Sequence, residues 1–400
     1  VAASAIVATL TTLLMGVVSD RTGMRKPFIC GGYLLWGLST MAFGLVTVEN
    51  ASVLFPSANA IAVAAIMVIA LDCIMTFFGS TANDAAFNAW LTDSTDNTNR
   101  GSAEGINAMM PLVAILAVFG GFMAFDLNKS ESWTLIFAII GAATVAIGIL
   151  GIFIIEEKKV KPSETGYLKN VIYGFRPSTV KANPSFYFYL AAFIIFNISI
   201  QIFMPYLIIY YDKSLGLGGS YVFIMAPAVI VAAVVTALWG RVYDKKGFGF
   251  SGALALAWLS AGYVILFLFT NTALVFIGSL LMMCGYLSGM AVFGAKIRDL
   301  TPHGKAGMLQ GVRIFSQVLV PGVIGPYIGS LVLANADTIL NGDGTESFLP
   351  NSNIFLAALV PIVILAIFLA IYGGKKKPRT VDLTTPFEDK ETQSTTWDEY

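Results

Sequence analysis

The sequence predicts an all-α membrane protein that crosses the bilayer many times. Only 12% of the 400 residues are charged, which is half the share of about 25% that is usual in soluble domains. The uncharged stretches are also long enough for the roughly 20 apolar residues that a membrane-spanning helix needs. These two observations argue against a soluble enzyme. The net charge of +0 argues against a nucleic-acid binder, because that role needs a basic face.

Turn residues and charges divide the apolar sequence into eleven predicted helices. The first five lie near 2–18, 28–48, 61–91, 107–125 and 133–155. The other six lie near 186–209, 221–240, 251–270, 273–297, 308–334 and 354–373. The uncharged run 247–295 is long enough for two helices, so we predict a turn at the polar residues 270–272.

Basic residues are distributed unequally between the two sides of the membrane. When alternate loops are assigned to one side, that side holds 22 of the 24 Lys and Arg residues. The positive-inside rule predicts that this side is cytoplasmic, and the C-terminus with it. The chain then begins outside, in an apolar run without an initiator Met, so we expect one N-terminal helix to be missing from this sequence. A multi-pass protein of the cell membrane, plasma or inner, is predicted.

Four segments follow from this topology. Residues 1–155 form an N-terminal half with five of six helices, and residues 186–373 form a C-terminal half with six. The polar, basic segment 156–185 is predicted to be a cytoplasmic linker. Residues 374–400 are predicted to be a disordered cytoplasmic tail, since they are polar and charged.

Two patterns occur once in each half. Residues 16–23 match residues 240–247 at an offset of 224, and residues 93–106 match residues 299–312 at an offset of 206. Both pairs lie in predicted cytoplasmic loops, so the two repeats run parallel. Parallel six-helix halves, with substrate bound between them near the midplane, are typical of major facilitator transporters. With the missing helix restored, the count is six plus six.

Two motifs resemble a known family. The loop 16–26, Gly-x-x-x-Asp-Arg-x-Gly-x-Arg-Lys, is similar to the signature loop of the major facilitator superfamily. Residues 83–101 (Asn-Asp-Ala-Ala-Phe-Asn-Ala-Trp, then Asp and Arg-Gly) and 299–311 resemble the glycoside–pentoside–hexuronide:cation symporters, the melibiose-permease-like family of that superfamily. The resemblance implies a secondary active transporter that takes up a sugar or glycoside with a cation by alternating access.

The resemblance also implies substrate-binding residues. Asp84 corresponds to the carboxylate on the fourth helix that hydrogen-bonds sugar hydroxyls. A carboxylate within the bilayer costs roughly 3 kcal/mol, so it should face a wet cavity or a partner. Asn88 lies one turn further along the helix and Asn83 precedes Asp84, so all three suit a polyhydroxylated ligand. Asn197 and Gln201 share a face of helix 186–209; they line the cavity opposite Asp84 or form an interhelical polar contact.

The coupling ion is predicted to be H⁺ rather than Na⁺. The two carboxylates that the family carries on its second helix are replaced here by Ala8 and Thr12. Proton coupling through Asp84, Asp72 or a carboxylate on the absent helix is therefore favoured over sodium coupling, although Asp72 equally suits a structural contact. Passive facilitation is the remaining alternative. Arg313, at the start of helix 308–334, either extends to the membrane surface or neutralises Asp84 or a bound anion.

Residues of the repeated loop motif are predicted to gate the cytoplasmic side. Asp20 and Asp244 each end a helix, where they can pair with basic residues and with a neighbouring helix N-terminus. The alternative is that these charges only set the topology. The gating set is Gly16, Asp20, Arg21, Gly23, Arg25, Asp244 and Gly247. A second repeated set is predicted to hold the cytoplasmic loops without contacting substrate, and consists of Asp93, Arg100, Asp299 and Lys305.

No cofactor, metal site or enzymatic activity is predicted. The single histidine, His303, and the three cysteines Cys30, Cys73 and Cys284 lack the spacing of metal ligands or of a disulfide framework. We expect a monomer whose partners are a small sugar or glycoside, a coupling cation and the lipid bilayer. The alternative function on the same fold is an exporter of amphipathic compounds or a lysolipid flippase, which would have a larger and more apolar cavity.

Overall fold

The computed structural model describes residues 2–122, 125, 130–157, 173–302, 306–340 and 346–373. Its first half follows the predicted order of helices. The elements are α1 (Ala2–Thr22), α2 (Lys26–Phe43), α3 (Val48–Leu54), α4 (Ala60–Gly79), the π-helix η1 (Ser80–Phe87), α5 (Asn88–Ser94), α6 (Arg100–Phe122) and α7 (Ser130–Ile154).

The second half begins after two short elements in the predicted linker, η2 (Tyr173–Phe175) and α9 (Pro177–Ala182). Its first membrane helix, α10 (Pro184–Phe203), continues through η3 (Met204–Tyr206), α11 (Leu207–Ile209) and η4 (Tyr210–Ser214). The remaining elements are η5 (Gly218–Tyr221), α12 (Val222–Leu268), α13 (Thr272–Asp299), α14 (Ala306–Ile314), η6 (Phe315–Leu319), α15 (Val320–Val332), β1 (Thr338–Leu340), β2 (Glu346–Phe348) and α16 (Asn353–Gly373).

Within the described residues, seven helices are long and apolar enough to cross a membrane, or eight if α2 and α3 count as one broken span. The element α12 contains two of the predicted helices, because Gly247 interrupts it with φ 73° and ψ −177°. The turn predicted at 270–272 is confirmed. Asn271 caps α13 there, and its side-chain oxygen accepts a hydrogen bond from the Ala273 amide at 3.0 Å.

Three local features differ from the prediction. The helix predicted at 28–48 ends at Phe43, and α3 follows it at an angle of 91°. The helix predicted at 61–91 contains the π-helical segment η1, which changes its register. A short antiparallel hairpin, β1 with β2, lies in the polar connection between α15 and α16. Apolar periodicity does not predict such features, because they depend on local packing and on turn residues.

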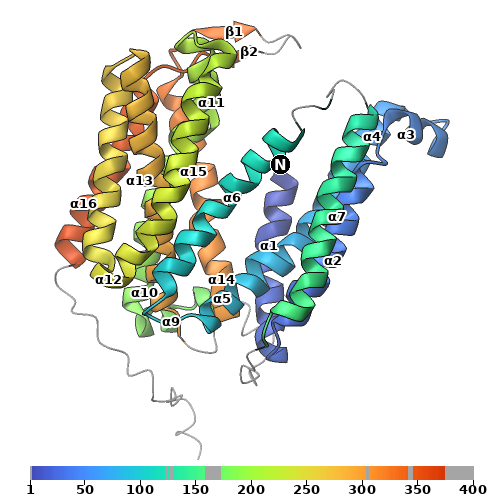
Figure 1. Ribbon diagram of the computed structural model, residues 1–400, viewed down its shortest axis with the longest axis horizontal. Coiled ribbons are helices and arrows are strands. Elements are labelled where there is room, and N and C mark those ends of the chain that lie inside the picture. The colour runs from blue at the N-terminus through green and yellow to red at the C-terminus, as the bar shows by residue number, and fades with distance from the viewer. Residues whose placement is uncertain are drawn as a thin grey trace, which may run out of the picture.

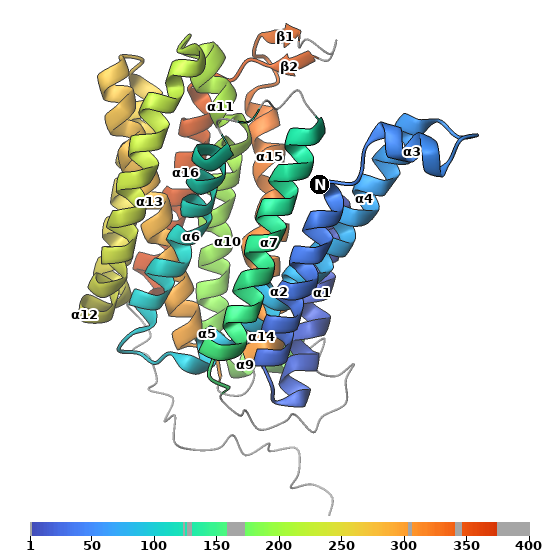
Figure 2. The ribbon, with the colours of Figure 1, turned by 45° about the vertical axis from the view of Figure 1, so that its right-hand side comes forward.

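The two halves lie side by side, and α6 of the first half leans against the second (Figure 1). Turning the molecule shows α1, α2 and α4 grouped on the side away from α12 and α13 (Figure 2). In the second half, buried aromatic rings from α10, α12 and α16 form a continuous core, with Phe203, Tyr263 and Phe355 at most 6.5 Å apart between ring centroids. This rigid packing positions the helix ends that meet the first half.

Candidate functional site

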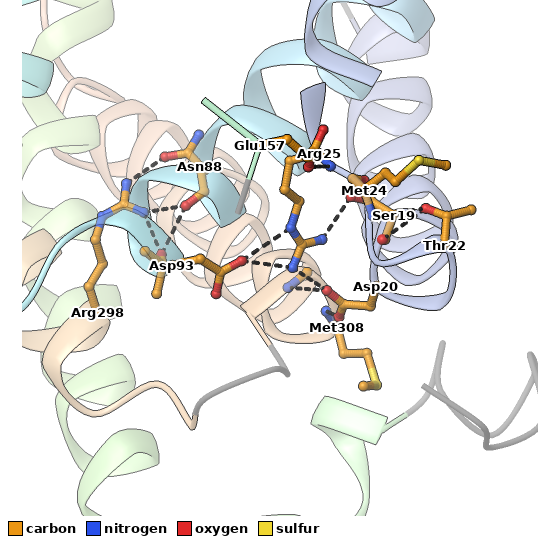
Figure 3. A network of polar contacts seen from close by, with 12 residues as sticks. Ser19, Asp20, Thr22, Met24, Arg25, Asn88, Asp93, Glu157, Arg298 and Met308 are labelled. Carbon is orange, nitrogen blue, oxygen red and sulfur yellow. Dashed lines mark hydrogen bonds and ion pairs between the residues drawn. The ribbon is translucent and has the colours of Figure 1, made fainter. Parts of the chain in front are cut away.

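The loop between α1 and α2 folds Arg25 back under the end of α1. Gly23 makes this turn possible, since its φ of 64° is disfavoured for residues with a side chain. The Arg25 guanidinium is 1% exposed and donates to Asp20 at 2.5 Å and to Asp93, at the end of α5, at 3.1 Å. Figure 3 shows the guanidinium lying between the two carboxylates. Burial lowers the pKa of Arg25, but both carboxylates raise it, and the net pKa lies above its ordinary value.

Asp20 also binds the opposite half. Its carboxylate accepts hydrogen bonds from the backbone amides of Gly307 at 3.2 Å and Met308 at 2.7 Å, in the first turn of α14 (Figure 3). An anion at a helix N-terminus satisfies amides that have no partner within the helix and interacts favourably with the helix dipole. One carboxylate therefore joins α1, Arg25 and α14.

The second copy of the motif makes the reciprocal contact. Asp244 of the second half accepts from the Gly101 amide at 2.7 Å and from the Ser102 amide at 2.9 Å, in the first turn of α6. The Ser102 hydroxyl also donates to it, at 2.5 Å. Gly247 repeats the positive φ of Gly23, with a value of 73°. Each half thus caps one helix of the other half, at the end predicted to be cytoplasmic.

Glycines allow the helices to approach closely beside both caps. A Cβ atom added at Gly16 would meet the Gly307 carbonyl oxygen, and one added at Gly240 would meet the Gly101 carbonyl oxygen. No residue with a side chain fits at this separation. Arg21 of the same motif is exposed, and within the described ranges it makes no ion pair across the interface.

A buried charged cluster lies next to the caps and was not predicted from sequence. Glu104 of α6 accepts from Arg298 of α13 and, at 3.0 Å, from Arg313 of α14. Arg298 also donates to the side chains of Asn88 at 2.6 Å and Thr92 at 2.7 Å, in the first half. Since buried charges are costly unless paired, the cluster holds the two halves together. The sequence signal that could have indicated this cluster is the position of Glu104, Arg298 and Arg313, which are ionisable residues close to apolar runs.

The predicted loop network is partly present among the described residues. Arg100 forms an ion pair with Asp299 at 3.3 Å, across the interface between the halves. Tyr243 donates to the other oxygen of Asp299 at 2.5 Å. Asp93 pairs with Arg25, as described above. Lys305 and His303 lie outside the described residues.

Asp84 lines a separate cavity of about 240 Å³ in the first half. The lining residues come from α1, α2, α4 and η1, and include Asn83, Ser80 and the Trp36 indole. The Asn83 amide donates to the Asp84 carboxylate at 3.2 Å, and the Tyr33 hydroxyl donates to Asn83 at 3.3 Å. The π-helical segment η1 places Ser80, Asn83 and Asp84 on one wall of the cavity. Turns of π-helix occur often at functional sites.

Asn88 does not join Asp84 in this cavity, contrary to the predicted shared face. The wider π-helical turn alters the register, so that the Asn88 amide donates to the carbonyl of Asn83, five residues earlier, at 2.9 Å. Its side-chain oxygen is bound to Arg298. Arg313 likewise neither neutralises Asp84 nor extends to the membrane surface. It is 7% exposed and paired with Glu104, because burial at the interface requires a counter-charge.

Asn197 and Gln201 lie away from the Asp84 cavity. Asn197 is buried, and its amide donates to the Phe193 carbonyl within α10 at 2.8 Å. Gln201 is half-buried and packs against Gly325 of α15. Of the described residues in the second half, none lines the cavity that holds Asp84. Asp72 is half-exposed on α4 and lies twelve residues before Asp84, about three helical turns away.

Comparison with known proteins identifies the fold. The solved structures that resemble the chain include the following three, each at too low an identity to show more than the fold. The proton:xylose symporter XylE, bound to 6-bromo-6-deoxy-D-glucose, is 12% identical with a TM-score of 0.66 over 93% of this chain and 84% of that chain. The human organic anion transporter MFSD10 is 13% identical, with a TM-score of 0.63 over 92% of this chain and 82% of that chain. A bacterial homologue of the iron transporter ferroportin, in an outward-facing state, is 12% identical, with a TM-score of 0.63 over 93% of this chain and 90% of that chain.

No protein with a curated description matches the sequence. The model of the Major Facilitator Superfamily matches residues 1–326, which is most of the chain. Two helical halves, joined at one end by repeated helix caps, agree with that match. The chain therefore belongs to the Major Facilitator Superfamily and is a multi-span membrane transporter.

Proposed function

We propose that this protein takes up a sugar or glycoside together with a proton, by alternating access across the cell membrane. The Asp84 cavity carries this proposal. Asp84, Asn83 and Ser80 offer acceptors and donors for hydroxyl groups, and Trp36 offers an aromatic face on which a sugar ring can stack. Apolar walls with a few placed polar groups are typical of small-molecule sites.

The electrostatics of Asp84 support proton coupling. Among the described residues Asp84 has no cationic partner, and its carboxylate accepts from the neutral Asn83 amide. A carboxylate held within the membrane without a counter-charge is a functional-site candidate that can gain and lose a proton during transport. Ala8 lines the same cavity, at a position where the resembling symporters carry a cation-binding carboxylate. Its apolar side chain supports H⁺ over Na⁺.

The caps supply the gate in this proposal. Asp20 and Asp244 close the predicted cytoplasmic end while solute enters from outside. Release of solute then requires both carboxylates to leave the N-termini of α14 and α6. The Glu104 cluster must separate in the same step, because its members belong to both halves.

The test uses the full-length protein in sealed proteoliposomes that contain a pH-sensitive dye. A panel of mono- and disaccharides is added without a preset gradient. We expect sugar-dependent internal acidification that is lost in Asp84→Asn and retained in Asp212→Asn, a carboxylate paired with Lys213 at the opposite end. Loss in Asp72→Asn with retention in Asp84→Asn would move the coupling role to Asp72. Acidification that survives both variants would contradict proton coupling through either residue.

The alternative is an exporter of amphipathic compounds or a lysolipid flippase. It is favoured by a larger, mainly apolar cavity of about 750 Å³ in the second half. That cavity is lined by α10, α12, α13 and α16 alone, whereas alternating access moves substrate between the halves. Absence of any sugar or sodium response, together with transport of a fluorescent lysolipid, would replace the symporter proposal with this one.

A further inference from the structure

The 750 Å³ cavity is a lateral groove on the second half. Its floor contains the buried side chains of Leu256 and Ile362, and its rim contains the half-exposed Val363 and Ile367. Exposed apolar side chains on membrane helices face lipid. The volume falls within the range of about 300–1,000 Å³ that is typical of ligand sites. The groove is therefore open to the bilayer and large enough for part of a lipid molecule.

The groove has the length of one leaflet. Along α12 its lining runs from Phe248 to Ser260, which is about 18 Å at the rise of an α-helix. The hydrocarbon core of a bilayer is about 30 Å thick, so the groove spans close to half of it. One end lies beside Gly247 and near the last residues of α13 and α16. This is the end predicted to face the cytoplasm.

A cation marks that end. Lys296 lines the groove, and its ammonium group lies 5.2 Å from the centre of the Tyr189 ring. In the described part of the chain Lys296 forms no ion pair. The neighbouring Asp299 carboxylate is close enough to interact electrostatically with Lys296, but its ion pair is with Arg100 and its hydrogen bond is with Tyr243. Lys245 and Lys246 are exposed and lie within α12, directly before Gly247, at the same end of the groove. The groove is thus apolar along its length and positive at its mouth.

The internal repeat shows that this shape is specific to the second half. An equivalent cavity of about 280 Å³ lies between α2, η1 and α7 in the first half. At the offset of 224, Ile29 and Tyr33 of that cavity correspond to Ala253 and Ala257 of the groove. The smaller side chains leave the additional volume. Gly249, which also lines the groove, has open space beside it, since a Cβ added there would meet nothing within 4 Å.

The charge is specific to the second half as well. At the offset of 206, Lys296 corresponds to Trp90, whose indole donates to the Glu156 carbonyl at 3.2 Å. No charged side chain lines the cavity of the first half. Volume and positive charge therefore occur together in one repeat and are both missing from the other, among the described residues.

We propose that the groove binds one anionic phospholipid of the cytoplasmic leaflet. An acyl chain lies along α12 and α16, and the phosphate contacts the Lys296 ammonium. Basic pockets between membrane helices on the cytoplasmic side bind anionic headgroups, with about 1 kcal/mol per lysine near the surface. Lys245 and Lys246 attract the same headgroup at longer range. The ligand is a resident lipid and not the transported solute, because the groove belongs to one half only.

Native mass spectrometry of the delipidated full-length protein tests this binding. The protein is incubated with equal amounts of phosphatidylglycerol and phosphatidylcholine. We expect a preference for phosphatidylglycerol that falls about fivefold in Lys296→Gln, which is the ratio that corresponds to about 1 kcal/mol. Lys296→Arg should keep the preference. Lys213→Gln, the same change of charge at the opposite end, should leave it unchanged.

Volume is tested separately from charge. Ala257→Tyr introduces the side chain of the repeat-equivalent position, and Gly249→Leu fills the groove from a neighbouring position. Both variants should lose the lipid adduct for either headgroup while their thermal unfolding shows a folded protein. An unchanged preference in Lys296→Gln, or an unchanged adduct in both filled variants, would overturn the proposal. Displacement of the lipid by millimolar inorganic phosphate would also overturn it, since it would show a bare anion site.

Discussion

Removal of the negative charge at Asp244 is expected to open the end of the transporter that is predicted to be cytoplasmic. Asp244→Asn keeps the size of the side chain and one acceptor oxygen, but it loses the carboxylate that holds two amides of α6. In the described residues this carboxylate forms no ion pair. The substitution therefore tests the helix cap alone, whereas Asp20→Asn would also disturb Arg25.

The magnitude follows from the two amide contacts. Hydrogen bonds to a charged group contribute about 1.5–3 kcal/mol each, compared with about 0.5–1.5 kcal/mol for neutral ones. Loss of the interaction with the helix dipole adds about 0.3–1 kcal/mol. Asp244 is half-buried, so solvent reduces the sum, and we expect a net loss of about 1–2 kcal/mol. The ratio of closed to open molecules should then fall about 5- to 30-fold.

Spin labels at Arg21 and Lys245 provide the assay. These two exposed residues occupy equivalent positions in the repeat, one in each half. Double electron–electron resonance measures the distance between the labels and hence the populations of closed and open states. Asp244→Asn should shift the distribution toward longer distances. Asp212→Asn, at the opposite end, serves as the control.

A distance distribution identical to that of the unsubstituted protein would refute the argument that the Asp244 cap holds the halves together. The double variant with Asp20→Asn gives a second check. The two caps share no partner, so their effects on the free energy of closure should add. A double variant no more open than either single variant would show that the two contacts do not act on the same equilibrium.

Three further predictions concern the same interface and its turns. Glu104→Gln should lower the free energy of unfolding of the closed state by about 3 kcal/mol, because it leaves two buried arginines without a counter-charge. Thermal unfolding in detergent should show a lower Tm, and an unchanged Tm would contradict this. Gly240→Ala should favour the open state in the distance assay, since its Cβ would collide with the Gly101 carbonyl. Gly247→Ala should lower the free energy of unfolding by about 1–3 kcal/mol, because alanine disfavours the positive φ at this position. The Tm should be lower than that of the control Gly249→Ala, and equal Tm values would refute the argument from backbone strain.

The fold was predictable because lipid imposes simple rules on sequence. The all-helical class, the order of the helices and the repeated halves follow from apolar length and from the repeat at offsets 224 and 206. The angle between α2 and α3 and the π-helical segment η1 were not predictable. The hydropathy of a segment is the same whether its backbone is a straight α-helix, bends or contains a π-helical turn. These features therefore depend on tertiary packing.

The candidate site shows the same division. Asp20, Asp244 and Asp84 stand out in the sequence as acids at helix ends or within an apolar run. Their partners do not, because the amides at the starts of α6 and α14 come from the opposite half of the chain. The prediction that Asn88 shares a face with Asp84 was wrong because it assumed an uninterrupted α-helical register.

The sequence by itself determined that this chain is a two-part helical membrane protein with a charged motif repeated at one end. Periodicity, charge and repetition are properties of the chain, so they can be read without coordinates. Only the tertiary structure decided that each motif caps a helix of the other half, that Glu104 joins Arg298 and Arg313, and that small side chains beside Lys296 leave a groove. These contacts join residues up to 288 positions apart, and their geometry depends on how the helices pack.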